Sequence, residues 1–237
     1  MIYITGDMHA NINPDMEKYL QENLNKDDIL LQLGDFGYYW NISIINNYPD
    51  FPFKTIAVLG NHENYSLFET FRDTNIFGAR CKEVKKNVYV VKNGEILNIE
   101  NKKFFVFGGA LSIDKAYRLP YISWWPQEQP NIADFNNAVE NLSRNNYNID
   151  YFLAHDVDRD IASKMFHRPS IINSSTSDML RELEFKIKEN NGKDYEYFFG
   201  HWHAYGKFSY YTCLYEQIYC IETGDTKFFP RIYNYGE

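Results

Sequence analysis

Five short apolar runs along the chain each end in residues that can bind a metal ion. One of them, Lys54–Leu59, leads directly into Gly60-Asn61-His62-Glu63. Short continuous apolar runs bounded by glycine are typical of buried β-strands. The other runs, with the ligand-type residues that follow them, are Ile2–Thr5 with Asp7 and His9, Ile29–Leu33 with Asp35, Tyr151–Ala154 with His155, and Tyr195–Phe199 with His201 and His203. Because all five end in metal-ligand chemistry, the pattern predicts one site at one edge of a sheet.

Helical patterns alternate with these runs in the first third of the chain. A helix is predicted from Pro14 to Leu24, with Asn13 as its N-cap, and a second helix around Ser66–Arg72. Strands that alternate with helices favour a largely parallel sheet. The first third is therefore predicted to contain three β-loop-α units.

The middle of the chain changes to a pattern of short strands. Val84–Val91, Glu95–Ile99 and Lys103–Phe107 are predicted to be strands, separated by Asn93-Gly94 and by Asn101-Lys102. Short polar pairs between apolar runs are typical of hairpins. Consecutive hairpins are therefore predicted here.

The last third combines helices with a further set of strands. Ile132–Arg144 and Thr176–Glu189 have helical periodicity, and the strand Asp150–Ala154 lies between them. Gly206–Tyr215 and Gln217–Glu222 alternate as strands do and are predicted to close a second sheet. No repeat or linker divides the chain, so we expect a single domain of residues 1–237.

One long segment, Leu111–Pro130, is irregular. Segments of this length without regular structure are uncommon in compact domains and are usually functional or disordered. This segment is rich in aromatic residues, including Trp124 and Trp125, which argues against disorder. It is predicted to be a lid-like insertion or a wall of a substrate site.

Composition restricts the class of protein. The chain has 237 residues, a formal net charge of −8 and three scattered cysteines, which does not suit a disulfide framework. No segment approaches the roughly 18 consecutive apolar residues of a membrane span. An acidic chain also does not suit an extended nucleic-acid surface. We therefore predict a soluble, cytoplasmic protein with no membrane partner.

The candidate ligands form a mixed nitrogen and oxygen set without thiolates. They are Asp7, His9, Asp35, Asn61, His155, His201 and His203. Such a set suits Mn, Fe, Zn, Co or Ni better than an all-oxygen Ca or Mg site. This number of ligands is too large for one tetrahedral ion but suits two divalent or trivalent ions that share a bridging carboxylate. Two ions about 3.5–4 Å apart can act on both the attacking and leaving oxygens of an in-line displacement at phosphorus.

Together and in order, these blocks resemble those of the calcineurin-like metallophosphoesterases: Asp7-x-His9, Gly34-Asp35, Gly60-Asn61-His62-Glu63, His155 and Gly200-His201-x-His203. The resemblance extends to about His203 and therefore covers most of the chain. It implies a mixed α/β fold, with two face-to-face mixed β-sheets flanked by helices in a four-layer sandwich. It also implies a metal-dependent phosphoester hydrolase.

The resemblance gives each of these residues a role. Asp7, His9 and His203 would hold one metal ion, Asn61, His155 and His201 would hold the other, and Asp35 would bridge the two. Mn is expected first, with Fe, Zn, Co or Ni as alternatives. A water shared by the metals would attack phosphorus. His62 would act as the general acid, a task that suits an imidazole because it titrates near neutral pH.

The chain departs from the protein-phosphatase branch of this family in one place. That branch has Asp-Arg-Gly shortly after the Gly-Asp block, whereas this chain has Phe36-Gly37-Tyr38-Tyr39-Trp40. The departure argues against a serine/threonine protein phosphatase. Arg118 is then predicted to bind the substrate phosphate beside Asn61, and a surface ion pair between Arg118 and Asp114 is the alternative.

Other residues of similar chemistry are assigned structural roles. His167 lies outside every block and is predicted to be a surface or packing residue. Glu63 and Asp156 are predicted to be hydrogen-bond partners of the ligands or surface charges.

Two classes of function follow from the sequence. The leading one is a hydrolase that acts on a small phosphomonoester, phosphodiester or nucleotide. The alternative is a catalytically silent regulatory module that binds metal or nucleotide, and it is kept open by the missing Asp-Arg pair. A serine or cysteine hydrolase is excluded because the chain has no Gly-x-Ser-x-Gly elbow and no cysteine in a ligand loop. The sequence leaves the choice of ester and the oligomeric state open.

Overall fold

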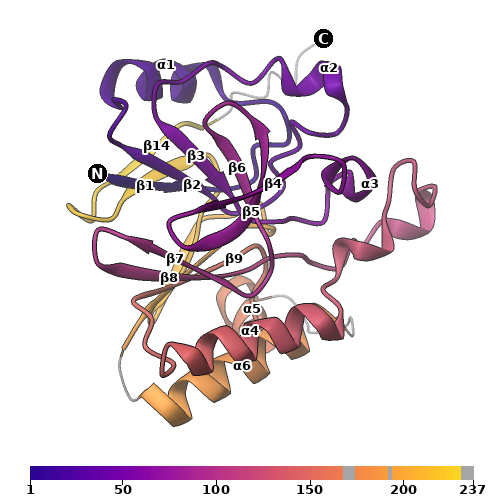
Figure 1. Ribbon diagram of the computed structural model, residues 1–237, viewed down its shortest axis with the longest axis vertical. Helices are drawn as coiled ribbons and strands as arrows, with labels where there is room; N and C mark the ends of the chain where they lie inside the picture. The colour runs from indigo at the N-terminus through magenta and orange to yellow at the C-terminus, as the bar shows by residue number, and fades with distance from the viewer. Residues whose placement is uncertain (168–173, 192–193, 231–237) are drawn as a thin grey trace.

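The computed structural model describes residues 1–167, 174–191 and 194–230 and contains two β-sheets packed face to face (Figure 1). In spatial order, the eight-stranded sheet consists of β14 (Thr226–Phe228), β13 (Gln217–Cys220), β1 (Ile2–Thr5), β2 (Ile29–Gln32), β3 (Lys54–Ala57), β6 (Val88–Val91), β5 (Ala79–Lys85) and β4 (Arg72–Ile76). The six-stranded sheet consists of β11 (Gly206–Phe208), β12 (Tyr211–Cys213), β10 (Glu196–Phe199), β9 (Tyr151–Ala154), β8 (Lys102–Phe107) and β7 (Glu95–Ile99).

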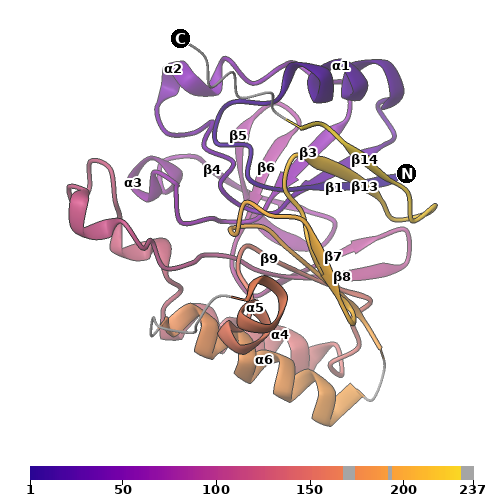
Figure 2. The same cartoon turned by 180° about the vertical axis from the view of Figure 1, so that it is seen from behind.

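Helices cover the outer face of each sheet (Figures 1 and 2). The helices α1 (Pro14–Asn23), α2 (Ile42–Ile45) and α3 (Tyr65–Phe68) lie over the eight-stranded sheet, and α4 (Ile132–Arg144), α5 (Arg159–Phe166) and α6 (Ser175–Asn191) lie over the six-stranded sheet. The arrangement is therefore helices, sheet, sheet, helices. It confirms the predicted mixed α/β fold with two face-to-face sheets in four layers.

An apolar core between the two sheets holds these layers together. Ile4, Leu31 and Ile56 of the eight-stranded sheet are buried in one cluster with Phe104 and Phe198 of the six-stranded sheet. Strands buried on both faces require apolar residues throughout, which explains the continuous apolar runs in the sequence. The strands that lead to the candidate ligands are therefore held rigidly in the centre of the protein.

The predicted β-loop-α organisation is present at the N-terminus. Strand β1 pairs in parallel with β2, and β2 pairs in parallel with β3. Helix α1 begins where predicted, because the Asn13 side chain accepts hydrogen bonds from the backbone N–H groups of Asp15 and Met16. The predicted parallel pairing of the first third is thus confirmed.

The predicted helix around Ser66–Arg72 is only partly correct. Helix α3 ends at Phe68, and Arg72 begins β4, which pairs antiparallel with β5. Phe77 and Gly78, between the two strands, have φ of 50° and 85°, the left-handed backbone of a tight hairpin turn. The sequence-based prediction did not include this turn and therefore missed the β4–β5 hairpin.

Two turns in the middle of the chain also differ from the prediction. The expected strand Val84–Val91 is divided by a turn at Asn87, whose φ is 63°, so that β5 and β6 form a hairpin. The expected hairpin at Asn93-Gly94 is wrong, because this turn carries the chain from β6 in one sheet to β7 in the other. The hairpin of β7 and β8 is confirmed, with Glu100 and Asn101 in its turn.

The C-terminal strands divide between the two sheets. β11 and β12 extend the six-stranded sheet as predicted. The prediction that Gln217–Glu222 joins them is wrong, because β13 pairs antiparallel with β1 in the eight-stranded sheet. Its Ile218 and Cys220 are buried in the cluster beneath α1, which favours that position over the second sheet. Helix α5 was not anticipated from the sequence.

Residues 111–130 project from the body beside α3 and α4, at the right of Figure 1 and the left of Figure 2. The segment contains two short 3-10 helices, η1 (Lys115–Tyr117) and η2 (Pro126–Glu128). Its outer part is exposed, whereas Ser112, Trp125 and Glu128 at its base are buried. Within residues 1–167, 174–191 and 194–230, no helix combines the length and the apolar character that a bilayer crossing requires.

Candidate metal centre

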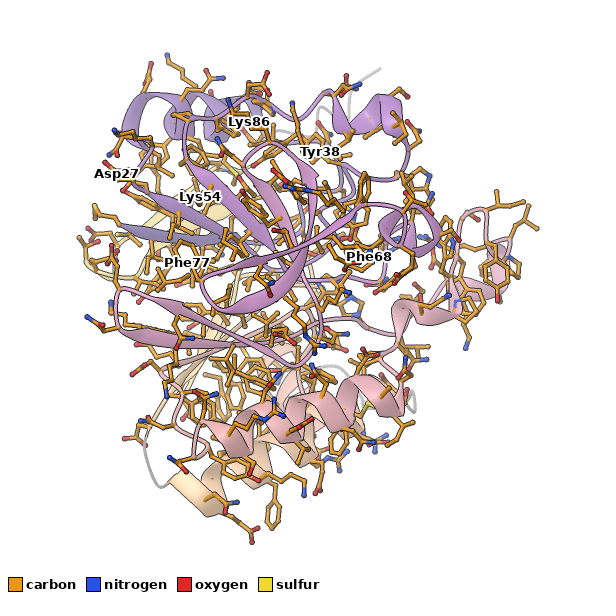
Figure 3. The ribbon with its side chains drawn as sticks, in the orientation of Figure 1. Asp27, Tyr38, Lys54, Phe68, Phe77 and Lys86 are labelled. Atoms are coloured by element: carbon orange, nitrogen blue, oxygen red, sulfur yellow. The ribbon has the colours of Figure 1, made fainter. Side chains whose placement is uncertain are left out.

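The predicted ligands come together at the C-terminal ends of five strands. Asp7 and His9 follow β1, Asp35 follows β2, and Asn61 and His62 follow β3. In the other sheet His155 follows β9, and His201 and His203 follow β10. Asp27 and Lys54 mark the N-terminal ends of β2 and β3, opposite to the ends that carry the candidate ligands. Figure 3 shows both residues on the far side of the molecule from Phe68 of α3.

Several of these residues have unusual backbone conformations. Positive φ values between 45° and 67° occur at Asp7, His9, Asp35, His201 and His203. Residues other than glycine rarely adopt this left-handed conformation, and its clustering is typical of functional sites, where the surrounding fold holds the strain. Strands β1, β2 and β10 therefore each end in a sharp turn that carries candidate ligands.

The glycines before the ligands are required by close packing. A Cβ atom at Gly34, whose φ is 84°, would lie 2.4 Å from Nδ1 of His155. A Cβ atom at Gly60 would lie 2.1 Å from the backbone nitrogen of Asp35. Only glycine permits these approaches, which explains why glycine stands at the junction of strand and ligand.

One group of side chains directs its hydrogen-bond acceptors to a single point. Nδ1 of His155 lies 2.7 Å from the carbonyl oxygen of Leu33 and must donate to it. In the neutral ring, Nε2 of His155 then carries a lone pair, and it lies 2.9 Å from Oδ1 of Asn61 and 3.3 Å from Oδ1 of Asp35. Nδ1 of His201 is 3.0 Å from the same Asn61 oxygen. With Nδ1 of His201 also unprotonated, these acceptors converge where a cation would fit between them.

A second group lies on the other side of Asp35. Nε2 of His9 is 2.9 Å from Nε2 of His203 and 3.6 Å from Oδ2 of Asp35. Nε2 of His203 is 4.0 Å from Oδ1 of Asp7, and its ring stacks on Tyr215. Asp7, His9 and His203 are close enough to share one ion, as are Asp7, Asp35 and His155. Asp35 thus contacts both groups.

Burial makes the charges of the site strongly interdependent. Asp7 and Asp35 are 2% and 1% exposed. Burial raises the pKa of Asp7 to about 8. Burial alone would lower the pKa of His155, but the carboxylates of Asp35 and Asp7 and the hydrogen bond to Leu33 together outweigh it and raise that pKa to about 10. A proton on His155 thus fills the position of a cation when no metal is present, so the donor set fits a metal ion in both charge and chemistry.

His62 lies at the open side of this cluster. Its backbone N–H donates to Oδ1 of Asp35 over 2.8 Å, which fixes the loop against the candidate bridging carboxylate. Nε2 of His62 is 3.4 Å from Nη2 of Arg118. Burial, together with this guanidinium, lowers the pKa of His62.

Arg118 reaches the site from the projecting segment. Its guanidinium binds the Asp114 carboxylate, with Nε 2.8 Å from Oδ2, and donates through Nη1 to the carbonyl of Ser123. The ion pair with Asp114 that the sequence offered as an alternative is therefore present. It holds the guanidinium beside His62, so the two interpretations of Arg118 are compatible.

The remaining charged residues also have definite positions. Glu63 is fully buried and accepts hydrogen bonds from the backbone N–H groups of Phe36 and Gly37. Asp156 is buried and accepts from Nε1 of Trp202. Neither is a surface charge. His167 is exposed at the C-terminal end of α5, as expected.

Two residues at the site were not anticipated from the sequence. The amide nitrogen of Asn61 donates to Oγ of Ser112, which in turn contacts the buried carboxylate of Glu128. Both residues belong to the irregular segment, where no periodicity or motif marks them. A pocket of about 780 Å³ opens beside the cluster, and its wall includes His62, Asp114, Arg159 and Trp202.

Comparison with known families agrees with this geometry. The family model for calcineurin-like phosphoesterases matches residues 1–205. A comparison with curated proteins found no match. The matched segment includes β1 to β10 and every loop that contributes a candidate ligand. The chain therefore belongs to the calcineurin-like phosphoesterase family.

Proposed function

We propose that this protein is a binuclear metal-dependent phosphoester hydrolase, built as one domain of residues 1–237 with residues 111–130 as a lid. Its family is one of metal-dependent phosphoesterases. The observation that carries the proposal is the convergence of three buried ligand atoms: Nε2 of His155 lies 2.9 Å from Oδ1 of Asn61 and 3.3 Å from Oδ1 of Asp35. Such a buried set of acceptors has little use without a cation.

The two groups of ligands would each hold one metal ion. Asp7, His9 and His203 would bind the first, Asn61, His155 and His201 the second, and Asp35 would bridge them. Mn is our first choice, with Fe, Zn, Co or Ni as alternatives, because the donors are imidazole, amide and carboxylate groups. Bound there, the ions would supply a nucleophilic water at neutral pH and would neutralise charge on the phosphoryl oxygens.

His62 and Arg118 would act on the substrate itself. A phosphoryl group seated on the ligand cluster would replace the contact between His62 and Arg118 with contacts to its own oxygens. Its negative charge would favour a proton on His62, which would then be given to the leaving oxygen. Arg118, held in place by Asp114, would bind a phosphoryl oxygen. Arg118 thus supplies the cation that the missing Asp-Arg pair would provide, which favours an active enzyme over a silent regulatory module.

The substrate would be a small phosphomonoester, phosphodiester or nucleotide in the cytoplasm. A pocket of about 780 Å³ beside the cluster has room for an organic group attached to the phosphate. The net charge of −8 does not suit a long nucleic acid. Size and charge therefore both favour a small substrate.

The proposal is tested by hydrolysis of p-nitrophenyl phosphate and of bis(p-nitrophenyl) phosphate. The protein is first stripped with chelator and then reloaded with Mn²⁺, and the His62→Asn variant is assayed in parallel. We expect activity that returns with the metal and is lost in the variant, and the preferred ester identifies the subclass. A protein that binds no metal, or full activity in the variant, would overturn the assignment.

A further inference from the structure

The side-chain amide of Asn61 can bind a metal ion in only one of its two orientations. Carboxylate ligands, which have two equivalent oxygens, do not have this restriction. Its oxygen and nitrogen have almost the same shape, but only the oxygen can bind a cation. With the amide turned over, an NH₂ group would face His155 and His201, and the site would lose a ligand. Some group outside the ligand set has to fix the orientation.

The structure contains such a group in the base of the 111–130 segment. Nδ2 of Asn61 lies 2.9 Å from Oγ of Ser112. Oγ of Ser112 contacts Oε2 of Glu128, and the backbone N–H of Ser112 donates to Oε1 of Glu128 over 3.1 Å. Asn61, Ser112 and Glu128 are 3%, 2% and 0% exposed, so water does not compete for these bonds.

The positions of the protons determine the direction of this chain of hydrogen bonds. A serine hydroxyl has one proton to donate, and a carboxylate can only accept. The proton of Ser112 therefore points to Glu128, and a lone pair of its Oγ faces Asn61. Only the NH₂ group of Asn61 can satisfy that lone pair, so the amide oxygen has to point at His155 and His201.

We propose that Ser112 and Glu128 are positioning residues that orient the Asn61 amide for metal binding. This inference rests on the proposed function, because it requires that Asn61 bind a metal. It also links the candidate metal site to the proposed lid, because the backbone carbonyl of Glu128 closes the base of the segment by accepting from the backbone N–H of Ala110 at 3.0 Å. Partners of this kind, which orient a ligand without touching the metal, typically change metal affinity about 10- to 100-fold when they are lost.

The variant Glu128→Gln reverses the direction of the hydrogen bonds from Asn61 through Ser112 to residue 128 while keeping the shape of the side chain. Because the N–H of Ser112 donates to one end of the side chain, the glutamine has to place its oxygen there and its NH₂ group against Oγ of Ser112. The hydroxyl proton of Ser112 then has to turn toward Asn61. The amide of Asn61 would turn over to accept it, which removes its oxygen from the metal site.

The experiment is a calorimetric titration of chelator-stripped protein with Mn²⁺, without substrate. We expect two sites in the wild type and about 10- to 100-fold weaker binding at one of them in Glu128→Gln. Ser112→Ala should show the same loss, and Ser112→Thr, which keeps the hydroxyl, should bind as the wild type does. Glu184→Gln, the same change at another buried glutamate, is the matched control and should keep both sites.

The same substitution in an Asn61→Asp protein separates an effect on the orientation of the amide from general damage to the fold. In Asn61→Asp the side chain has two equivalent oxygens, so no orientation has to be fixed. There Glu128→Gln should leave Mn²⁺ binding unchanged or strengthen it, because the hydroxyl of Ser112 can now donate to a carboxylate. Equal weakening in both backgrounds, or unchanged binding in Glu128→Gln alone, overturns the inference and leaves the proposed function standing. A wild type that binds neither Mn²⁺ nor any of the alternative metals overturns both.

Discussion

Arg118 places Nη2 at 3.4 Å from Nε2 of His62, although 55 residues separate the two positions along the chain and they belong to different structural elements. The guanidinium is held there by Asp114 and by the carbonyl of Ser123. A positive charge beside the candidate general acid disfavours the imidazolium form. Substrate, with its own negative charge, would remove that penalty, so protonation of His62 is expected to accompany substrate binding.

Replacement of Arg118 should weaken substrate binding more than it slows catalysis. A hydrogen bond between a guanidinium and a phosphoryl oxygen contributes about 1.5–3 kcal/mol. Arg118→Ala should therefore raise KM for p-nitrophenyl phosphate about 10- to 100-fold, and Arg118→Lys should recover part of this loss, because it keeps the charge but not the planar fork. Lys115→Ala, on the same segment, is the control for net charge. An unchanged KM in Arg118→Ala would show that Arg118 does not bind the substrate phosphate.

The role of His62 can be separated from metal binding by the choice of leaving group. Loss of a general acid typically costs about 10²- to 10⁴-fold in rate, and the cost is greatest when the leaving oxygen is strongly basic. His62→Asn should therefore slow hydrolysis of an alkyl phosphate more than that of p-nitrophenyl phosphate. Its metal content, measured by mass spectrometry of the protein, should equal that of the wild type. An equal loss for both esters would contradict proton donation by His62.

Asp35 should be required for metal binding as well as for turnover. Its two oxygens face His155 on one side and His9 on the other, at 3.3 and 3.6 Å. Asp35→Asn removes the charge that both candidate metals would share, so we expect fewer than two metal ions per chain and a kcat/KM at least about 10³-fold lower. Asp27→Asn, an exposed change before the N-terminal end of β2, whereas Asp35 follows its C-terminal end, should preserve both quantities. Two tightly bound ions in Asp35→Asn would exclude a bridging role.

The candidate ligand loops could be identified from sequence because their signal is local. Each follows a strand that is buried on both faces. In every loop except that of His155, a glycine stands at the junction where a Cβ atom would collide with a neighbouring loop, as at Gly34 and Gly60. Apolar runs and glycines are visible without any knowledge of the fold. Parallel pairing then brings the loops of β1, β2 and β3 to one end of the eight-stranded sheet and those of β9 and β10 to one end of the six-stranded sheet.

The errors arose where a local signal fits two different structures. Asn93-Gly94 favours a tight turn, and a tight turn is present, but it joins two sheets rather than two neighbouring strands. Gln217–Cys220 alternates as a strand should, yet nothing in that alternation specifies that β1 is its partner. The contact of Ser112 with Glu128 spans an irregular segment without periodicity. Such pairings depend on the packing of the whole chain, and single-sequence patterns do not contain it.

A buried carboxylate far from the site provides a test of the fold itself. Glu184 of α6 is 4% exposed and accepts hydrogen bonds from the hydroxyl groups of Tyr195 and Tyr211. These tyrosines lie at the N-terminal ends of β10 and β12, at the edge of the six-stranded sheet opposite to the ligand loops. Burial raises the pKa of Glu184 because it penalises the charged form more than Lys188 and the tyrosines favour it.

The free energy of unfolding should depend on pH through this glutamate. Because the pKa is higher in the folded state, the stabilisation from Glu184 is complete below its ordinary value of 4.5 and is lost as the pH rises through the folded-state value. Urea unfolding between pH 4 and pH 8 should therefore show a steeper loss of stability with rising pH in the wild type than in Glu184→Gln. Glu182→Gln, at an exposed position of the same helix, should follow the wild type. Parallel curves for the wild type and Glu184→Gln would mean that Glu184 keeps its ordinary pKa, with the tyrosine hydroxyl groups fully offsetting the effect of burial.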